Sequence, residues 1–158
     1  MKTKLLKTLL ISSGIIAISA ITVINPVKAE IPIKYDQVTT NEAIQGAIPI
    51  TLYFGKIVSI DFTAVDEYIT FIAPSDKSRF VYNTDLPVNS GEAQSVYLLP
   101  IKKIDFQGSY ATSYPNLIVK TINSKSESKQ YNFIINFSSE VMASTGIKIV
   151  PSSAQKVR

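Results

Sequence analysis

The stretch NLIVKTINSKSESKQYNFIINF, residues 116–137, contains two apolar runs separated by a polar patch. The first run, Leu117–Val119, is short and rich in β-branched residues. In the second, Tyr131–Phe137, a large apolar residue occupies every other position. The patch between them, Asn123–Lys129, is too polar to bury and too long for a two-residue turn. This pattern predicts a β-hairpin with a long solvated tip that closes a sheet.

Alternation of apolar and polar residues recurs along the chain, interrupted by turn residues such as Gly55, Pro74 and Gly91. Short strands at this spacing predict an all-β fold, a single β-sandwich of about seven to nine short, mainly antiparallel strands. Only the segment near Ser139–Ser144 suggests a helical turn. The other expected strands are Ile50–Phe54, Lys56–Thr63, Glu67–Ala73, Arg79–Tyr82, Ser95–Ile101 and Ile147–Val150.

The first residues of the chain read as a secretory signal peptide. Three lysines precede Leu9–Ile24, a mostly apolar stretch without charge, and Val27–Ala29 supplies the small residues of a cleavage site. An uncleaved membrane anchor is the alternative, but a full span needs about 20 apolar residues, and this stretch is interrupted by serines. We therefore expect a signal peptide over residues 1–29, an extended arm over 30–46, a β-sandwich over 47–150 and a tail over 151–158.

Charge and composition exclude several classes of protein. Four of the 16 basic residues lie in the leader and none of the 12 acidic ones does, so the remainder carries twelve of each. A nucleic-acid binder usually has a basic face, and here only Lys102–Lys103 and Lys77–Arg79 suggest one. We interpret these basic residues as solvated strand ends, with a local basic patch as the alternative. The chain has no cysteine and no histidine, which excludes disulfides, thiolate and histidine metal sites, and catalytic triads.

The remaining candidates for chemistry are three carboxylates, Asp61, Asp66 and Glu67, near one predicted turn. Such a cluster can act as an acid/base pair in a hydrolase. Charged residues at the start of a strand are more commonly exposed to solvent. Because no catalytic motif accompanies them, we predict a non-enzymatic protein without cofactor or metal.

Candidate interaction residues lie in two predicted loops. Tyr110 and Tyr114 flank a short polar segment before Pro115, and Lys125, Glu127 and Lys129 belong to the hairpin tip. Loop tyrosines anchor protein interfaces. They also stack on sugars, so a secreted or periplasmic binding module for a glycan or host protein is the alternative function.

The order of these elements resembles the N-terminal domain of TrbG/CagX-like proteins, to which TraK-like conjugation proteins are related. The likeness covers about residues 48–137. Ser75 stands where that family has the glycine of a GD-type turn, and the chain lacks the family's tryptophan. The segments that carry the likeness are Ile50–Phe62, Asp66–Ala73, Asp76–Phe80, Tyr97–Ile101, Asn116–Thr121 and Tyr131–Phe133.

The resemblance implies a function in assembly. Proteins of this family are periplasmic components of conjugation and type IV secretion machines, associated with the outer membrane. It implies an exported scaffold subunit that contacts other envelope proteins or further copies of itself. The resemblance predicts no nucleic-acid partner, and after cleavage we expect no membrane span.

Overall fold

The computed structural model describes residues 34–104, 113–140, 142 and 144–154 of the chain. All of them belong to one compact unit, Pro32–Arg158. They form one α-helix, α1 (Thr40–Gln45), three short 3-10 turns (Thr63–Val65, Val88–Ser90 and Ser152–Ala154) and nine strands. The strands are β1 Tyr35–Thr39, β2 Ile48–Tyr53, β3 Val58–Asp61, β4 Glu67–Pro74, β5 Phe80–Thr84, β6 Ser95–Pro100, β7 Asn116–Asn123, β8 Ser128–Ser138 and β9 Gly146–Val150.

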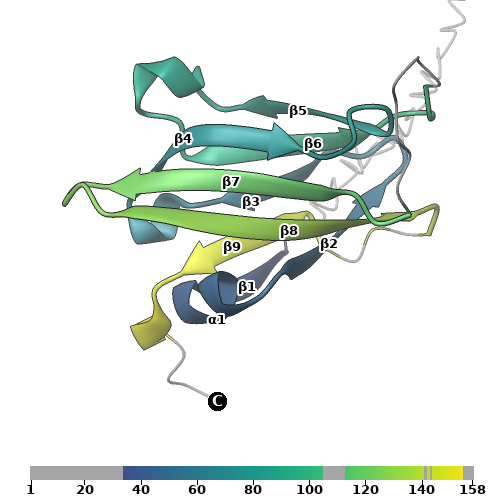
Figure 1. Ribbon diagram of the computed structural model, residues 1–158. Coiled ribbons are helices and arrows are strands. Elements are labelled where there is room, and N and C mark those ends of the chain that lie inside the picture. Colours follow the sequence, from purple (N-terminus) through teal and green to yellow (C-terminus); the bar gives the residue numbers. More distant parts are fainter. Residues whose placement is uncertain (1–33, 105–112, 141, 143, 155–158) are drawn as a thin grey trace, which may run out of the picture. The chain divides into compact units, whose positions relative to one another are not determined.

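The predicted hairpin is confirmed as β7 and β8, which lie side by side at the centre of one sheet (Figure 1). Its tip is shorter than predicted, because β8 begins at Ser128 rather than near Tyr131. Asn123 shapes the turn: its side-chain Oδ1 accepts the backbone N–H groups of Lys125 at 3.0 Å and Glu127 at 2.9 Å. Ser126 takes a left-handed conformation with φ 65°, which a single turn residue can adopt.

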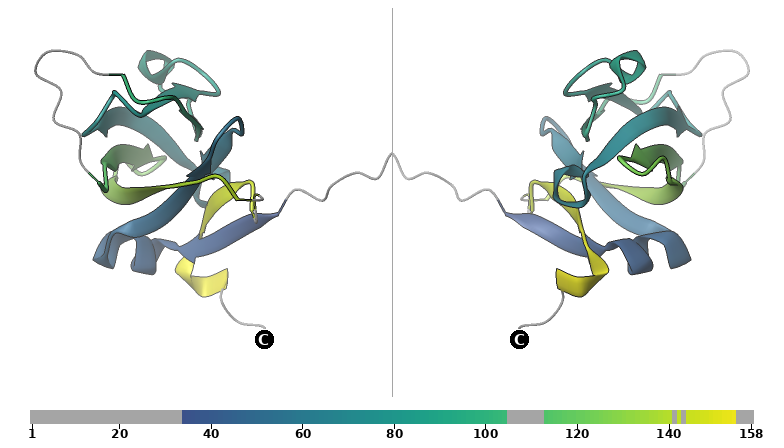
Figure 2. Two further views of the ribbon diagram at one scale, coloured as in Figure 1. Left: turned by 90° about the vertical axis from the view of Figure 1, so that its right-hand side faces the viewer. Right: turned by 90° about the vertical axis from the view of Figure 1, so that its left-hand side faces the viewer.

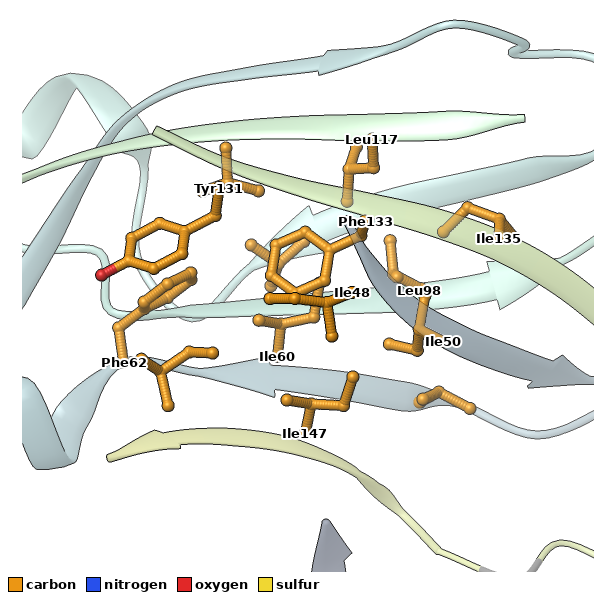
Figure 3. Packing of buried hydrophobic residues seen from close by; sticks show 14 of the residues in the cluster. Ile48, Ile50, Ile60, Phe62, Leu98, Leu117, Tyr131, Phe133, Ile135 and Ile147 are labelled. Atoms are coloured by element: carbon orange, nitrogen blue, oxygen red, sulfur yellow. The ribbon is translucent and has the colours of Figure 1, made fainter. Parts of the chain in front are cut away.

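The strands form two mixed sheets, with the orders β1-β9-β3-β6-β5 and β2-β8-β7-β4. Alternate residues of both sheets point to one shared apolar core, as period-two patterning requires. Figure 3 shows this packing, in which Phe133 and Ile135 from β8 face Ile60 and Leu98 from the other sheet. The predicted all-β fold is therefore confirmed.

Three of the seven strand pairings are parallel: β1 with β9, β3 with β9, and β2 with β8. The other four are antiparallel. Figure 2 shows β1, in blue, beside β9, in yellow, although they are far apart in the sequence. Gly146 makes this arrangement possible, since a Cβ at that position would lie 2.1 Å from the backbone oxygen of Ser59 on β3.

The prediction of an extended arm over residues 30–46 is wrong for its described part, which folds into β1 and α1. Thr39 caps the helix, since its backbone N–H donates to the Glu42 carboxylate at 3.0 Å and its hydroxyl accepts the Glu42 N–H at 3.3 Å. Ala43 is the buried residue of this helix. The predicted helical turn is also absent, since the described residues between 139 and 144 form no helix.

Candidate functional site

Glu67, the first residue of β4, is the most deeply buried carboxylate among the described residues, with 1% of its surface exposed. Two hydroxyl groups donate to its Oε2, that of Thr121 on β7 at 2.6 Å and that of Tyr131 on β8 at 2.8 Å. The ammonium of Lys129 lies 2.6 Å from its Oε1. Three neighbouring strands are thus joined through one carboxylate.

The contacts of the Glu67 carboxylate suit a role in stabilising the fold. Burial, followed by the hydrogen bond and charge of Glu67, raises the pKa of Tyr131, so its hydroxyl stays a donor. A carboxylate held by an ammonium and two hydroxyl donors is poorly placed to accept a proton from a substrate. Paired buried charges instead fix how elements align, because separating the pair would leave a charge without compensation.

The other two carboxylates of the predicted cluster have separate partners. Burial alone would raise the pKa of Asp61, but hydrogen bonds from Thr63, and then the hydrogen bond and charge of Lys148, outweigh it and lower that pKa from its ordinary value. Asp66 is exposed in a left-handed turn and accepts the Tyr68 hydroxyl at 3.1 Å. Within residues 34–104, 113–140, 142 and 144–154, no group of three or more acidic side chains is arranged to hold a metal ion.

The predicted interaction residues have different surroundings. Tyr110 lies outside the described residues, whereas Tyr114 is 69% exposed. Lys125 and Glu127 lie at the exposed hairpin tip, where the Glu127 carboxylate accepts the Asn123 side-chain N–H at 2.7 Å. Lys129 is half-buried, and its ammonium pairs with Glu67 at 2.6 Å.

The edges of the two sheets provide a further candidate. Exposed strand edges are expected to bind added strands in a fold of this class, but the sequence did not indicate which strand lies at an edge. An unpaired strand edge is a template for another strand, and proteins commonly block it with proline, charge or a bulge. The edge strand β1 carries the charged Asp36, and Pro49 lies in β2. The edge strand β4 has a register shift between Ile69 and Phe71, and its Ile69 N–H already donates to the Ala93 carbonyl at 2.7 Å.

The edge strand β5, by contrast, has the sequence FVYNT, without charge or proline. Two hydrogen bonds show which of its residues face β6: Asp85 N–H donates to Ser95 O at 3.2 Å, and Ile101 N–H donates to Arg79 O at 2.8 Å. Odd-numbered residues therefore pair with β6, by the alternation of antiparallel ladders. The residues whose backbone groups point away from β6 are Phe80, Tyr82 and Thr84. Of these, Thr84 already donates its N–H to the Asn83 side-chain oxygen at 2.9 Å.

An apolar groove adjoins this edge on the outer face of the sheet. Val81 lies opposite Leu99 in the ladder, and Ile57, just before β3, extends the patch. Ile57 is 59% exposed and Val81 46%, so both offer apolar surface beside the edge. The groove has a volume of about 170 Å³ and is lined by Ile57, Val81, Tyr82, Asn83, Tyr97, Leu98 and Leu99.

No family model matches the chain, and comparison with curated proteins and with solved structures gave no match either. Among the described residues, no helix is both long enough and apolar enough to cross a bilayer.

Proposed function

We propose that this protein is a non-enzymatic assembly subunit that binds another protein by strand addition to β5. The observation that carries the proposal is the combination of an edge strand without charge or proline, among the described strands, with the groove beside it. In strand addition, backbone hydrogen bonds supply affinity, and pockets for alternate side chains supply specificity. The outward N–H and C=O groups of Phe80 and Tyr82 meet the first requirement, and the Thr84 N–H would first have to exchange its hydrogen bond to Asn83 Oδ1. The groove between Ile57, Val81 and Leu99 meets the second.

The engaged carboxylates support a binding role over a hydrolytic one. The Glu67 carboxylate accepts hydrogen bonds from Thr121, Lys129 and Tyr131. Asp61 is paired with Lys148 at 3.2 Å. A general acid or base must reach the proton that it transfers, and the partners of Glu67 and Asp61 compete for that position.

We further propose that the assembly is an envelope complex of a conjugal transfer or type IV secretion system, located in the periplasm and associated with the outer membrane. The support is the resemblance of residues 48–137 to TrbG/CagX-like domains, together with the leader-like residues 1–29. A net charge near zero beyond the leader suits close association of subunits.

The test compares two matched lysine substitutions. Val81→Lys places a charge on the β5 edge, whereas Ile44→Lys places one on α1, where the side chain is similarly exposed at 50%. Tagged wild-type protein and both variants are purified from detergent-solubilised envelopes, and co-purifying proteins are quantified by mass spectrometry. We expect conjugation or secretion components with the wild type and Ile44→Lys, and their loss with Val81→Lys at unchanged melting temperature.

Equal recovery of those components with Val81→Lys would reject β5 as the binding edge. Recovery of the chain alone, mostly from the culture medium, would reject the scaffold role. In that case, retention on a glycan array that is lost in Tyr114→Ala would support the glycan-binding alternative.

A further inference from the structure

We infer that a pocket between the edge strands β1 and β2 binds a small ligand that carries a primary ammonium group on a compact apolar body. The pocket has a volume of about 200 Å³, and its lining comes from β1, β2, β3, β9 and Ser144. It is separate from the proposed binding edge, because β1 and β5 are the two outermost strands of the same sheet.

The inner wall of the pocket is the hydrophobic core itself. Four core residues from three strands line it: Ile48, Ile50, Val58 and Ile147. They keep 2–5% of their surface exposed, whereas most core residues among those described keep none. Figure 3 shows Ile48, Ile50 and Ile147 within the core between the sheets. The core therefore reaches solvent through this pocket.

Space remains here because β1 and β2, although consecutive strands, belong to different sheets. Each is the outermost strand of its sheet, and no described strand pairs with its other side. The side chains of Val38 and Val58 are short, and Gly146 has none. Water in such a pocket meets few polar partners, and replacing poorly held water with an apolar group favours binding.

The pocket also has a polar part. Asp36, an exposed residue of β1, lines it together with the hydroxyl-bearing residues Ser144 and Thr51. The Ser144 hydroxyl donates to Asp36 Oδ2 at 2.7 Å, which holds the carboxylate beside the pocket. Within the described ranges, Asp36 Oδ1 accepts no hydrogen bond, and no lysine or arginine forms an ion pair with this carboxylate. One carboxylate oxygen is therefore available to a ligand.

This combination selects the chemistry of the ligand. A negative charge beside an apolar wall favours a cation attached to an apolar body, and it disfavours carboxylates and phosphates. A primary ammonium has three donors, so it suits the Asp36 carboxylate together with a neighbouring hydroxyl. A guanidinium would need a broader, planar site to use its five donors.

The volume sets the size of the apolar body. An apolar cavity of about 150 Å³ binds benzene. A pocket of about 200 Å³ leaves room for about two more non-hydrogen atoms, at the roughly 30 Å³ that one water molecule occupies. Benzylamine adds one carbon and one ammonium nitrogen to benzene, so it is the matching probe.

An NMR titration of the isotope-labelled, purified protein tests the site. Benzyl alcohol is the neutral counterpart of benzylamine, with the same size and shape. At pH 7, where benzylamine is protonated, we expect both probes to shift the backbone amide signals of β1 and β2. Benzylamine is expected to bind about fivefold more tightly, the gain from one ion pair at an exposed carboxylate.

Two variants with matched controls separate charge from fit. Asp36→Asn is expected to remove the preference for benzylamine and to leave benzyl alcohol binding unchanged, whereas Asp66→Asn, at an exposed carboxylate outside the pocket, keeps the preference. Val38→Phe fills the pocket with an aromatic ring and is expected to abolish binding of both probes. Val81→Phe adds the same ring to the groove beside β5 and is expected to preserve binding. Melting temperatures show whether each variant is folded, and Asp36→Asn keeps the shape of the side chain.

Three results would overturn the inference. An absence of shifts in β1 and β2 throughout a titration into the millimolar range would show that the pocket binds neither probe. Equal affinities for the two probes, or a preference that persists in Asp36→Asn, would reject the ammonium site. Binding that persists in Val38→Phe and is lost in Val81→Phe would assign the probes to the groove beside β5. None of these results changes the recovery of envelope partners with Val81→Lys, so the proposed function fails or stands separately.

Discussion

Removing one oxygen atom tests whether the Glu67 network stabilises the fold. Tyr131→Phe deletes the hydroxyl that donates to Glu67 Oε2 at 2.8 Å. The aromatic ring is kept, and with it the contact to Phe62, whose ring centroid is 5.1 Å away. The substitution therefore leaves the apolar packing in place and isolates the hydrogen bond.

The expected loss follows from burial and charge. Hydrogen bonds to charged groups contribute about 1.5–3 kcal/mol, and Tyr131 and Glu67 are almost completely buried, so water cannot readily replace the hydroxyl. Glu67 keeps Thr121 and Lys129 as partners, which favours the middle of that range. We predict a decrease of about 2 kcal/mol in the free energy of unfolding.

Urea unfolding at pH 7 measures this change, and a loss of about 2 kcal/mol corresponds to a midpoint lower by roughly 1 M urea. Tyr68→Phe is the matched control. Its hydroxyl also donates to a carboxylate, Asp66, but on the surface, so we expect a change within about 0.5 kcal/mol. A loss below about 0.5 kcal/mol in Tyr131→Phe would refute the argument that the network stabilises the fold.

Two further substitutions test other parts of the structure. Gly146→Ala is expected to lower the free energy of unfolding by at least about 3 kcal/mol in urea unfolding, because its Cβ would lie 2.1 Å from the Ser59 carbonyl oxygen. Gly46→Ala, with no atom within 4 Å of the new Cβ, should change it little, and equal effects would contradict the close approach. The folded state lowers the pKa of Asp61, so its hydrogen bonds from Thr63 and its pairing with Lys148 stabilise the protein above about pH 4. That stability is lost as pH falls through the lowered pKa, and Asp61→Asn should show a smaller loss between about pH 7 and pH 3; identical losses would refute this assignment.

Local patterning was sufficient to predict most strands. The alternation in residues 131–137 places Tyr131, Phe133 and Ile135 in the core, as the structure shows. Such a pattern arises because a strand directs successive side chains to opposite faces, and only one face of each sheet is covered. All eight predicted strands are present in the structure, with bounds shifted by a few residues.

The alternation of apolar and polar residues did not predict the elements in which burial does not alternate. In β1, only Thr39 is buried and two positions are exposed, so the strand is recognised by its pairing with β9 rather than by its own sequence. A usable signal was present for α1, since Thr39 followed by Glu42 three residues later matches a capping box. The sequence interpretation did not use that signal.

The network and the open edge depend on contacts between distant segments. Glu67 and Lys129 are 62 residues apart, and nothing local to either residue predicts their pairing. For β5, the absence of charge and proline is visible in the sequence, but its edge position follows only from the strand order. Sequence patterns alone therefore could not distinguish β5 from a central strand.

The strand edges also determine whether an assembly closes after a few copies or continues to grow. A strand edge that pairs with a different edge of the next copy produces an open filament, whereas an edge that pairs with itself closes after two copies. The other sheet has Pro49 on β2 and a covered, irregular β4, so it offers poor partners for β5. The buried Glu67 pair opposes slippage of β4, β7 and β8, which would separate its charges. A strand added to β5 would therefore extend the sheet β1-β9-β3-β6-β5 and leave the second sheet unchanged.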